Sequence, residues 1–441
     1  MKQSDSKQAV FTLYGGINVI GGTKLYVQSG ESEVLFDFGS TFAPGFGSFD
    51  TVLRPRPGRE VDDYMALGII PNLPKLYAGS KEGHDLPVFI SHFHLDHVGL
   101  LFLLDPSVPI YMSEPSYQLY QQLEVIGEGI GQHDDIRVFT YGQWIEWKSL
   151  RVLPLEVDHD IQGATGFFVE TLSGTIAYTG DFRGHGNHPD KTEAFFQYLG
   201  AHRTHALISE GTRAGEASGR HTVPEKDMAH MLAKTMENRS AVFFTLYHRN
   251  IERIAAFAAA AQAVSRKLVL TPATLHLFRT LAPVQYEQSR PAVYVCATQA
   301  AESLPSYLTG LDVQTVNAQE LANDQTAFLV ELPYEHLTEL VDIQPHNGAI
   351  YIHSDGVPLG AYDPAYANVT NWLQTFGVDM VSVRSTGHAD PAYLQACIEQ
   401  ANPDVLYATH TFHPEQMPAP HSGLLVVPHI GRNYPIAPIS V

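Results

Sequence analysis

The feature that most constrains the fold of this chain is a change in the rhythm of its apolar segments near residue 222. Before that point, short apolar runs alternate with glycine-rich and polar turns, as in "AVFTLYGGINVIGGTKLYVQSG", a pattern typical of consecutive β-strands. From there to about residue 385, strand-like runs such as "SAVFFTL" alternate with helix-like runs such as "NIERIAAFAAAAQAV", which favours a parallel sheet flanked by helices. The last part returns to helix, strand and histidine-bearing loops. We therefore predict an α/β protein in which a β-rich domain is interrupted by an α/β insertion.

The composition bounds the size, location and partners of the protein. A length of 441 residues is enough for two domains, or for one large domain that carries an insertion. The apolar runs are too short to span a bilayer, the first residues lack the apolar core of a secretory signal, and two cysteines give no disulfide framework. We therefore expect a cytoplasmic protein that does not contact the membrane. The 27 basic and 47 acidic residues give a net charge of −20, which argues against broad non-specific binding of nucleic acid but allows a local cationic metal centre.

One short stretch, "VFISHFHLDHVGLL", concentrates residues that bind metals. His92, His94, Asp96 and His97 fall close together at the end of an apolar run. In an extended segment, residues two apart point to the same side, so His92 and His94 can hold one ion together. Asp96 and His97, where the chain turns into a helix, are expected to point toward a neighbouring position. Imidazole and carboxylate ligands suit zinc, and also manganese or iron.

Two ions need more ligands than one loop supplies, and three later residues lie in suitable places. His159 in "LEVDHDIQGATGF", Asp181 in "IAYTGDFRG" and His410 in "VLYATHTFHPE" each follow a strand-like run. Loops at the tips of strands gather into functional sites. We therefore expect these three residues to join the earlier cluster in one metal centre.

With these residues identified, the chain resembles the metallo-β-lactamase fold and, within it, the β-CASP nucleases, with ribonuclease J the most similar group. The metal motifs match those of the fold, and "GGINVIGGTKLYV", "FFTLYHRNIERI" and "STGHAD" resemble ribonuclease J segments. The resemblance implies an αββα sandwich with an inserted β-CASP domain of Rossmann-like α/β type. It implies three segments: 8–213 as the first part of the metallo-β-lactamase core, 214–385 as the β-CASP insertion, and 386–441 as the segment that completes the core.

The resemblance also implies a metal-binding role for each of the seven residues His92, His94, Asp96, His97, His159, Asp181 and His410. If two ions bind, the first would be held by His92, His94 and His159. The second would be held by Asp96, His97 and His410, and Asp181 would bridge the two ions. We expect two divalent ions, with zinc preferred and manganese as the alternative.

Three further residues match positions of the family outside the metal ligands. Asp37, in "VLFDFG", matches an early aspartate and is expected to hold a ligand histidine or the loop backbone in place. His388, in "RSTGHAD", is the candidate general acid or phosphate clamp, because a histidine titrates near neutrality and can deliver a proton to a leaving oxygen. Glu210, in "ISEGT", is expected to orient the His388 ring.

The expected activity is phosphodiester hydrolysis of the ribonuclease J type, with RNA as substrate and a water activated by two metal ions. Two alternatives stay open at this point. One is the hydrolysis of a small phosphodiester, thioester or lactone on the same fold, an option that the acidic surface keeps open. The other is a non-catalytic β-CASP subunit that scaffolds a partner nuclease. Endonucleolytic and 5′-exonucleolytic action are both compatible with the sequence, and so is a homodimer.

Overall fold

The computed structural model describes residues 8–41, 49, 52–216, 223–296, 304–360 and 363–437. The chain divides into two compact units. Unit 1 comprises Met1–Tyr120, Ile130–His221 and Gly387–Val441, and unit 2 comprises Gln121–Gly129 and Thr222–Thr386. The short segment Gln121–Gly129 has no counterpart in the segments that we expected from the sequence, whose bounds stay predictions.

The first sheet of unit 1 has seven strands in the order β21-β1-β2-β3-β4-β5-β6. These strands are β1 (Val10–Leu13), β2 (Leu25–Ser29), β3 (Ser32–Phe36), β4 (Val88–Phe89), β5 (Ile110–Ser113), β6 (Ile136–Phe139) and β21 (Asn433–Pro435). Strands β3 to β6 are parallel to one another, whereas β1 is antiparallel to both β2 and β21. The loops after β3 and β4, which carry Asp37 and His92, therefore leave from the same edge of the sheet.

The second sheet of unit 1 also has seven strands, in the order β20-β19-β11-β10-β9-β8-β7. These are β7 (Ile145–Trp147), β8 (Leu150–Glu156), β9 (Thr165–Glu170), β10 (Thr175–Tyr178), β11 (Ala206–Glu210), β19 (Val405–Thr409) and β20 (Leu424–Val426). Strands β10, β11 and β19 are parallel, and β8 has the same direction because β9 is antiparallel to both β8 and β10. The segments after β8, β10 and β19, with His159, Asp181 and His410, consequently leave from one edge.

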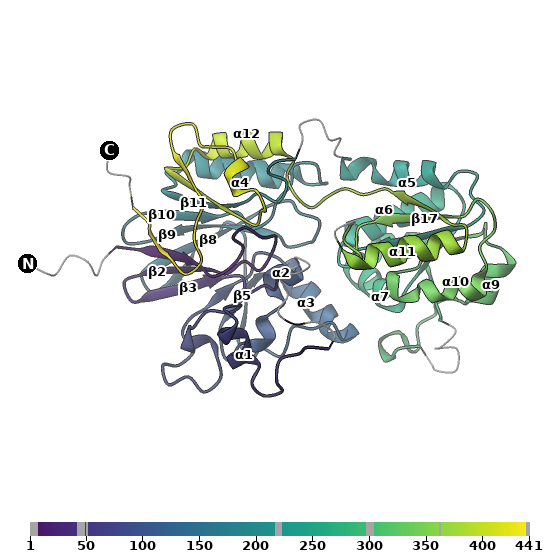
Figure 1. Cartoon of the computed structure of the whole chain (residues 1–441), viewed down its shortest axis with the longest axis horizontal. Coiled ribbons are helices and arrows are strands. Elements are labelled where there is room, and N and C mark those ends of the chain that lie inside the picture. The colour runs from purple at the N-terminus through teal and green to yellow at the C-terminus, as the bar shows by residue number, and fades with distance from the viewer. Residues whose placement is uncertain are drawn as a thin grey trace, which may run out of the picture. The chain divides into compact units, whose positions relative to one another are not determined.

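The two sheets of unit 1 pack face to face through a core that is rich in aromatic side chains. The ring of Phe36 on β3 lies 5.0 Å from that of Phe167 on β9, between ring centroids. Helices α4 (Pro189–Ala201) and α12 (Pro391–Ala401) cover the outer face of the second sheet (Figure 1), and their apolar side chains join those of β10, β11 and β19. Three helices follow strands of the first sheet: α1 (Glu60–Ala66), α2 (Leu95–Val98) and α3 (Glu114–Ile126), whose residues from Gln121 onward belong to unit 2. Helices α2 and α3 lie next to β5 (Figure 1). The predicted α/β class with a layered sandwich is confirmed.

Unit 2 contains a third sheet in which all seven strands are parallel, in the order β15-β14-β13-β16-β12-β17-β18. The strands are β12 (Val242–Leu246), β13 (Lys267–Leu270), β14 (Ala292–Tyr294), β15 (Thr315–Val316), β16 (Phe328–Glu331), β17 (Ile350–Ser354) and β18 (Asp379–Ser382). The alternation of strand and helix along the sequence predicted this arrangement, because parallel neighbours need a crossover connection between them.

Helices cover both faces of the third sheet. They are α5 (Met228–Met236), α6 (Ile251–Ala263), α7 (Pro272–Leu281), α8 (Pro283–Ser289), α9 (Ala318–Asn323), α10 (Leu340–Ile343) and α11 (Pro364–Thr375). Successive side chains of a strand point to opposite faces. Phe244 of β12 therefore stacks on Phe257 of α6 at 4.1 Å, whereas its neighbour Phe243 belongs to the core cluster that contains residues of α9, α10 and α11. None of the described helices combines the length and apolar composition that a bilayer crossing requires.

The two ends of the insertion are tied to each other inside unit 2. The hydroxyl of Ser385 donates a hydrogen bond of 2.7 Å to the carbonyl of Val223. Arg253, a buried residue of α6, donates to both carboxylate oxygens of Glu225 at 2.6 and 2.9 Å and to the carbonyl of Ser385 at 2.9 Å. Its guanidinium also donates to Asp355 at 3.0 Å. The buried charge of Arg253 is thus compensated by groups from the start and the end of the insertion.

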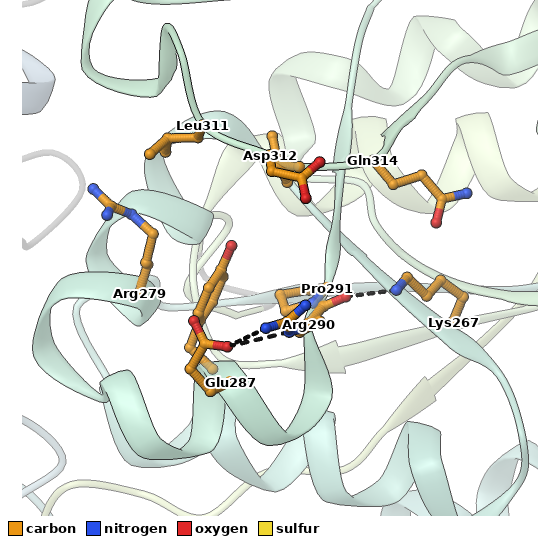
Figure 2. Close-up of a pocket in the computed structure, with 10 residues that line it drawn as sticks. Lys267, Arg279, Glu287, Arg290, Pro291, Leu311, Asp312 and Gln314 are labelled. Atoms are coloured by element: carbon orange, nitrogen blue, oxygen red, sulfur yellow. Dashed lines mark hydrogen bonds and ion pairs between the residues drawn. The ribbon is translucent and has the colours of Figure 1, made fainter.

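A cavity with a volume of about 380 Å³ lies in unit 2, at the edge where β13, β14 and β15 begin (Figure 2). Two of its charged side chains have partners within the lining: Lys267 donates a hydrogen bond to the carbonyl of Arg290, and Arg290 forms an ion pair with Glu287. None of the residues that line this cavity is one of the candidate site residues that we identified from the sequence.

Candidate metal centre

The candidate residues from the sequence all lie in unit 1, most of them in the segments that follow strands, whereas Asp96 and His97 lie in helix α2 and His388 lies in the loop before α12. Asp37 directly follows β3, Glu210 is the last residue of β11, and His410 directly follows β19. Asp37 and His410 have φ angles of 59° and 52°, in the left-handed region that non-glycine residues rarely adopt. The chain therefore turns sharply at both residues. Strained backbone conformations of this kind cluster at functional sites.

His92, His94 and His159 form the first of two groups of potential ligands. The ring nitrogens of these three histidines come within 4.8 Å of one another. His94 Nδ1 and His159 Nε2 are separated by 3.1 Å. The loop of His92–His97 and the loop after β8, which are far apart in the sequence, are thus brought together in space.

Asp96, His97, Asp181 and His410 form the second group, which is buried. Asp181 Oδ2 lies 3.2 Å from His97 Nε2 and 3.5 Å from His410 Nε2. Asp96 Oδ2 lies 2.9 Å from His410 Nε2. Asp181 also connects the two groups, because the same Oδ2 atom is 3.8 Å from His92 Nε2.

The donor atoms of both groups fit divalent metal ions. In a tetrahedral site with bonds of about 2.1 Å, neighbouring ligand atoms are about 3.4 Å apart, and the distances within the groups scatter around that value. Among the described residues, His92 Nε2, His97 Nε2 and Asp181 Oδ2 are buried and make no hydrogen bond. Buried polar atoms are normally satisfied, so their convergence indicates a cation as the common partner.

The electrostatics of the second group support the same conclusion. Burial opposes the ionisation of Asp181, but the neighbouring His410 and His97 outweigh it and hold the pKa of Asp181 well below its usual range. Burial also opposes the charged form of His97, but Asp181 and Asp96 raise the pKa of His97 well above its usual range. The carboxylates thus stay ionised in a buried site, where a divalent cation is their natural counter-charge.

The outer nitrogens of four of the histidines are fixed by hydrogen bonds, and this orients their inner nitrogens toward the centre. Nδ1 is the outer nitrogen in each case, and its partners are Ser91 for His92, Asp37 for His97, the Gly387 carbonyl for His159 and Thr212 for His410. An outer partner of this kind sets the tautomer and the ring orientation of a metal-binding histidine. Nε2 is therefore the nitrogen that these four residues present to an ion.

Asp37 is the centre of a buried network that supports this arrangement. Its Oδ2 atom accepts hydrogen bonds of 2.7 Å from the hydroxyls of Ser91 and Tyr178 and lies 2.7 Å from His97 Nδ1. Its Oδ1 atom accepts a bond of 2.7 Å from the Ser91 amide. Asp37 thus contacts both His97 and the backbone of the loop at Ser91, and neither Ser91 nor Tyr178 stood out in the sequence.

His388 and Glu210 form a pair beside the second group. Both oxygens of Glu210 are 3.1 Å from His388 Nδ1, and Asp181 Oδ2 is 3.9 Å from the same nitrogen. Burial lowers the pKa of His388, but the carboxylates of Glu210 and Asp181 outweigh it and raise the pKa to about 9. Glu210 also accepts a hydrogen bond from the Thr212 hydroxyl, the group that contacts His410 Nδ1. The pair is therefore connected to the metal centre through Asp181 and Thr212.

Lys24 is a buried residue beside the metal loop that sequence reasoning missed. Its ammonium group donates hydrogen bonds to the carbonyls of Gly22 at 3.0 Å and Gly39 at 2.7 Å. Gly22 and Gly39 both pack against the backbone of Asp96. The Gly22 amide donates a hydrogen bond to the Asp96 carbonyl, and a Cβ atom on Gly39 would lie 1.6 Å from the same oxygen. Only the adjacent glycine-rich turn in the sequence hinted at such close backbone packing.

The stability of the metal-free protein is expected to depend on Lys24 in a pH-dependent way. Burial lowers the pKa of Lys24 from 10.5 to about 7, so between these pH values the unfolded chain binds a proton that the folded chain does not. The free energy of unfolding should therefore rise with pH across this window, by at most about 1.4 kcal/mol per pH unit from this group. Lys24→Met should remove that slope in urea unfolding at pH 7.5 and 9.5. Exposed Lys226→Met is the control, and parallel pH profiles of wild type and Lys24→Met would contradict the assignment.

Comparisons with known proteins place this geometry in context. No family model matches the chain. Ribonuclease J of Sinorhizobium meliloti is 26% identical over 278 residues, which cover 60% of this chain and 45% of that protein. Ribonuclease J of Pyrococcus abyssi is 24% identical over 231 residues, which cover 51% of this chain and 49% of that protein. The chain thus spans about half the length of these relatives.

A solved structure matches over nearly the whole chain. The crystal structure of a protein of unknown function from Enterococcus faecalis V583 superimposes with a TM-score of 0.79 and 25% sequence identity, covering 97% of this chain and 100% of that chain. The two-unit architecture is therefore shared with another protein. Together with the curated relatives, the comparisons confirm the similarity to ribonuclease J that the motifs predicted.

Proposed function

We propose, from the premise that this chain is a ribonuclease J-like protein of the β-CASP group, that it hydrolyses phosphodiester bonds in RNA with the help of two divalent metal ions. The observation that carries the proposal is the pair of ligand groups connected by Asp181, whose Oδ2 atom lies within 3.8 Å of ring nitrogens from both groups. His388, within 3.9 Å of the same oxygen, supplies an acid beside the centre.

The proposed assignment of ligands follows the two groups. His92, His94 and His159 would hold the first ion, Asp96, His97 and His410 would hold the second, and Asp181 would contact both. When bound, the ions would supply positive charge to a phosphoryl oxygen and lower the pKa of a water to near neutrality. Zinc is the preferred ion for this set of imidazole and carboxylate ligands, and manganese is the alternative.

His388 is proposed to donate the proton that the leaving oxygen needs. When water attacks phosphorus, the bond from phosphorus to the leaving nucleoside oxygen breaks, and that oxygen takes up a proton. Glu210 accepts from His388 Nδ1 and holds the imidazole in its charged form, so Nε2 is the nitrogen that would deliver the proton. The same charge can clamp a phosphate oxygen before the bond breaks.

RNA is the proposed substrate because the relatives are ribonucleases and the centre offers local positive charge in an acidic protein. The net charge of −20 favours few phosphate contacts outside the site. Binding of single-stranded RNA should therefore weaken only slightly with salt, with a log–log slope of about −1 if one or two phosphates are neutralised. The two buried, unpaired cysteines are compatible with a reducing cytoplasm, where we place the protein.

The decisive experiment compares substrates under identical metal conditions. Metal-free protein is reconstituted with Zn²⁺ or Mn²⁺ and given 5′-labelled RNA, single-stranded DNA of the same sequence, a chromogenic phosphodiester, a thioester and a lactone. Cleavage of RNA that requires added metal supports the proposal, and the fragment lengths separate endonucleolytic from 5′-exonucleolytic action. Activity confined to thioesters or lactones would overturn the substrate. Two bound ions without hydrolysis of any substrate would favour the scaffold alternative.

A further inference from the structure

The inference concerns Asp160, an acidic residue next to His159 that has no role in the proposed function above. Its Oδ1 atom lies 3.4 Å from His94 Nε2 and 3.2 Å from His159 Nε2. The side chain is 13% exposed, and this oxygen is buried and makes no hydrogen bond within the described part of the chain. A carboxylate oxygen without a hydrogen bond is costly in such a position, so its placement calls for a specific partner.

His94 differs from the other histidines of the centre in the nitrogen that it directs inward. In His92, His97, His159 and His410, Nδ1 contacts an outer partner and Nε2 faces the ligand groups. In His94 it is Nδ1 that faces inward, 3.1 Å from His159 Nε2. To bind an ion through Nδ1, a neutral imidazole must carry its proton on Nε2.

The group that faces His94 Nε2 is the Asp160 carboxylate. A carboxylate favours a protonated ring nitrogen over a bare one, since two lone pairs would otherwise repel each other. This repeats the relation of Asp37 to His97 with the two ring nitrogens exchanged.

The loop that carries His388 is shaped to leave room for this carboxylate. Gly387 accepts from His159 Nδ1 through its carbonyl at 2.5 Å. A Cβ atom at position 387 would lie 2.6 Å from Asp160 Oδ1 and 2.6 Å from His159 Cε1. A side chain there would therefore displace Asp160, so the glycine and the acid form one packed unit behind the first ligand group.

We propose that Asp160 is a positioning residue for the first metal ion: it holds His94 in the tautomer that presents Nδ1 to that ion. This deepens the proposed function, since it rests on the first ligand group binding a metal. Asp160 is not proposed to bind the ion directly, because the potential ligand group that contains His92 includes His94 and His159 but not Asp160.

The test measures Zn²⁺ binding to the metal-free protein by competition with a chelator, without any RNA. Asp160→Leu keeps the branching of the side chain at Cγ and removes its acceptors, whereas Asp160→Asn keeps one acceptor oxygen. Loss of the hydrogen-bond partner of a ligand typically weakens metal binding by about 10–100-fold. Asp160→Leu should therefore lower the affinity for one of the two ions by this factor. Asp160→Asn should recover part of the loss, and the other ion should bind as in wild type.

A double-mutant cycle decides whether Asp160 acts through His94. In a His94→Gln background, Asp160→Leu should cause no further loss of Zn²⁺ affinity, since there is no imidazole left to orient. Additive losses would show that Asp160 binds the ion itself, and wild-type affinity in Asp160→Leu would show that it has no role; either result overturns the proposal. Because no substrate is present, these results are independent of whether the protein cleaves RNA. A protein that binds two ions with the expected cycle but leaves RNA intact would contradict the proposed substrate alone.

Discussion

Asp181→Asn is expected to abolish metal-dependent hydrolysis and to weaken the binding of both ions. Asp181 Oδ2 is the atom within 3.8 Å of ring nitrogens from both ligand groups, and the substitution removes its charge while keeping its shape. Metal ions contribute several kcal/mol of transition-state stabilisation, and each 1.36 kcal/mol is a factor of ten in rate. Turnover should therefore fall by at least about 10³-fold. Metal content by elemental analysis and turnover on RNA, measured on the same sample, test this.

Two companion variants make the Asp181 result specific. His97→Ala should lose one ion rather than two, together with activity, because His97 belongs to the second group alone. Asp190→Asn changes an exposed carboxylate in the first turn of α4 and should leave both metal content and turnover near wild type. Two tightly bound ions in the Asp181→Asn protein would show that this residue does not connect the sites.

His388→Ala should lower turnover by roughly 10²–10⁴-fold, the usual share of general acid catalysis, and should retain both ions. His388 Nδ1 lies 3.9 Å from Asp181 Oδ2, whereas Nε2 of His92, His97 and His410 lies 3.8, 3.2 and 3.5 Å from the same oxygen. Glu210→Gln should have a smaller effect in the same direction, since it keeps a hydrogen-bond acceptor for His388 Nδ1 and loses only the charge. Single-turnover rates on RNA separate the chemical step from binding.

The metal content of the His388→Ala protein is the informative control. Asp181, Glu210, His388 and His410 also come close enough together to hold an ion, so His388 could in principle be a ligand. Loss of one ion in this variant would show that His388 is a metal ligand and not the proton donor. Wild-type turnover with two ions bound would remove it from the mechanism altogether.

The sequence predicted the parts of this fold that repeat with a regular period. The alternation of strand-like and helix-like runs after residue 222 predicted the parallel sheet of unit 2, because parallel neighbours need a crossover connection between them. The spacing of His92, His94, Asp96 and His97 placed the first part of the centre on one loop. His159, Asp181 and His410 were identifiable because each follows a strand, and strands that leave from one edge bring their loops together.

The parts that could not be predicted depend on contacts between distant or irregular segments. Asp160 is adjacent to a recognised ligand, but its relevance depends on which nitrogen of His94 faces inward, and a sequence does not encode this locally. Lys24 hydrogen-bonds to backbone carbonyls. Every residue has such a carbonyl, so no residue type in the sequence identifies these partners. In the sequence, Arg253 is indistinguishable from an exposed helix residue, because its partners Glu225 and Ser385 are distant along the chain.

The joined ends of the insertion have a consequence for the order in which the protein folds. Strands β11 and β19 of unit 1 pair through residues such as Ser209 and Ala408, which are 199 positions apart in the sequence. If unit 2 folds first, Val223 and Ser385, which are 162 positions apart, are already in hydrogen-bond contact. The loop that must close to pair β11 with β19 then shrinks about fivefold, which lowers its closure entropy cost by about 1.5 kcal/mol. Early folding of the insertion would thus bring two distant strands of unit 1 much closer along the chain, and refolding should slow when the contacts of Arg253 are removed.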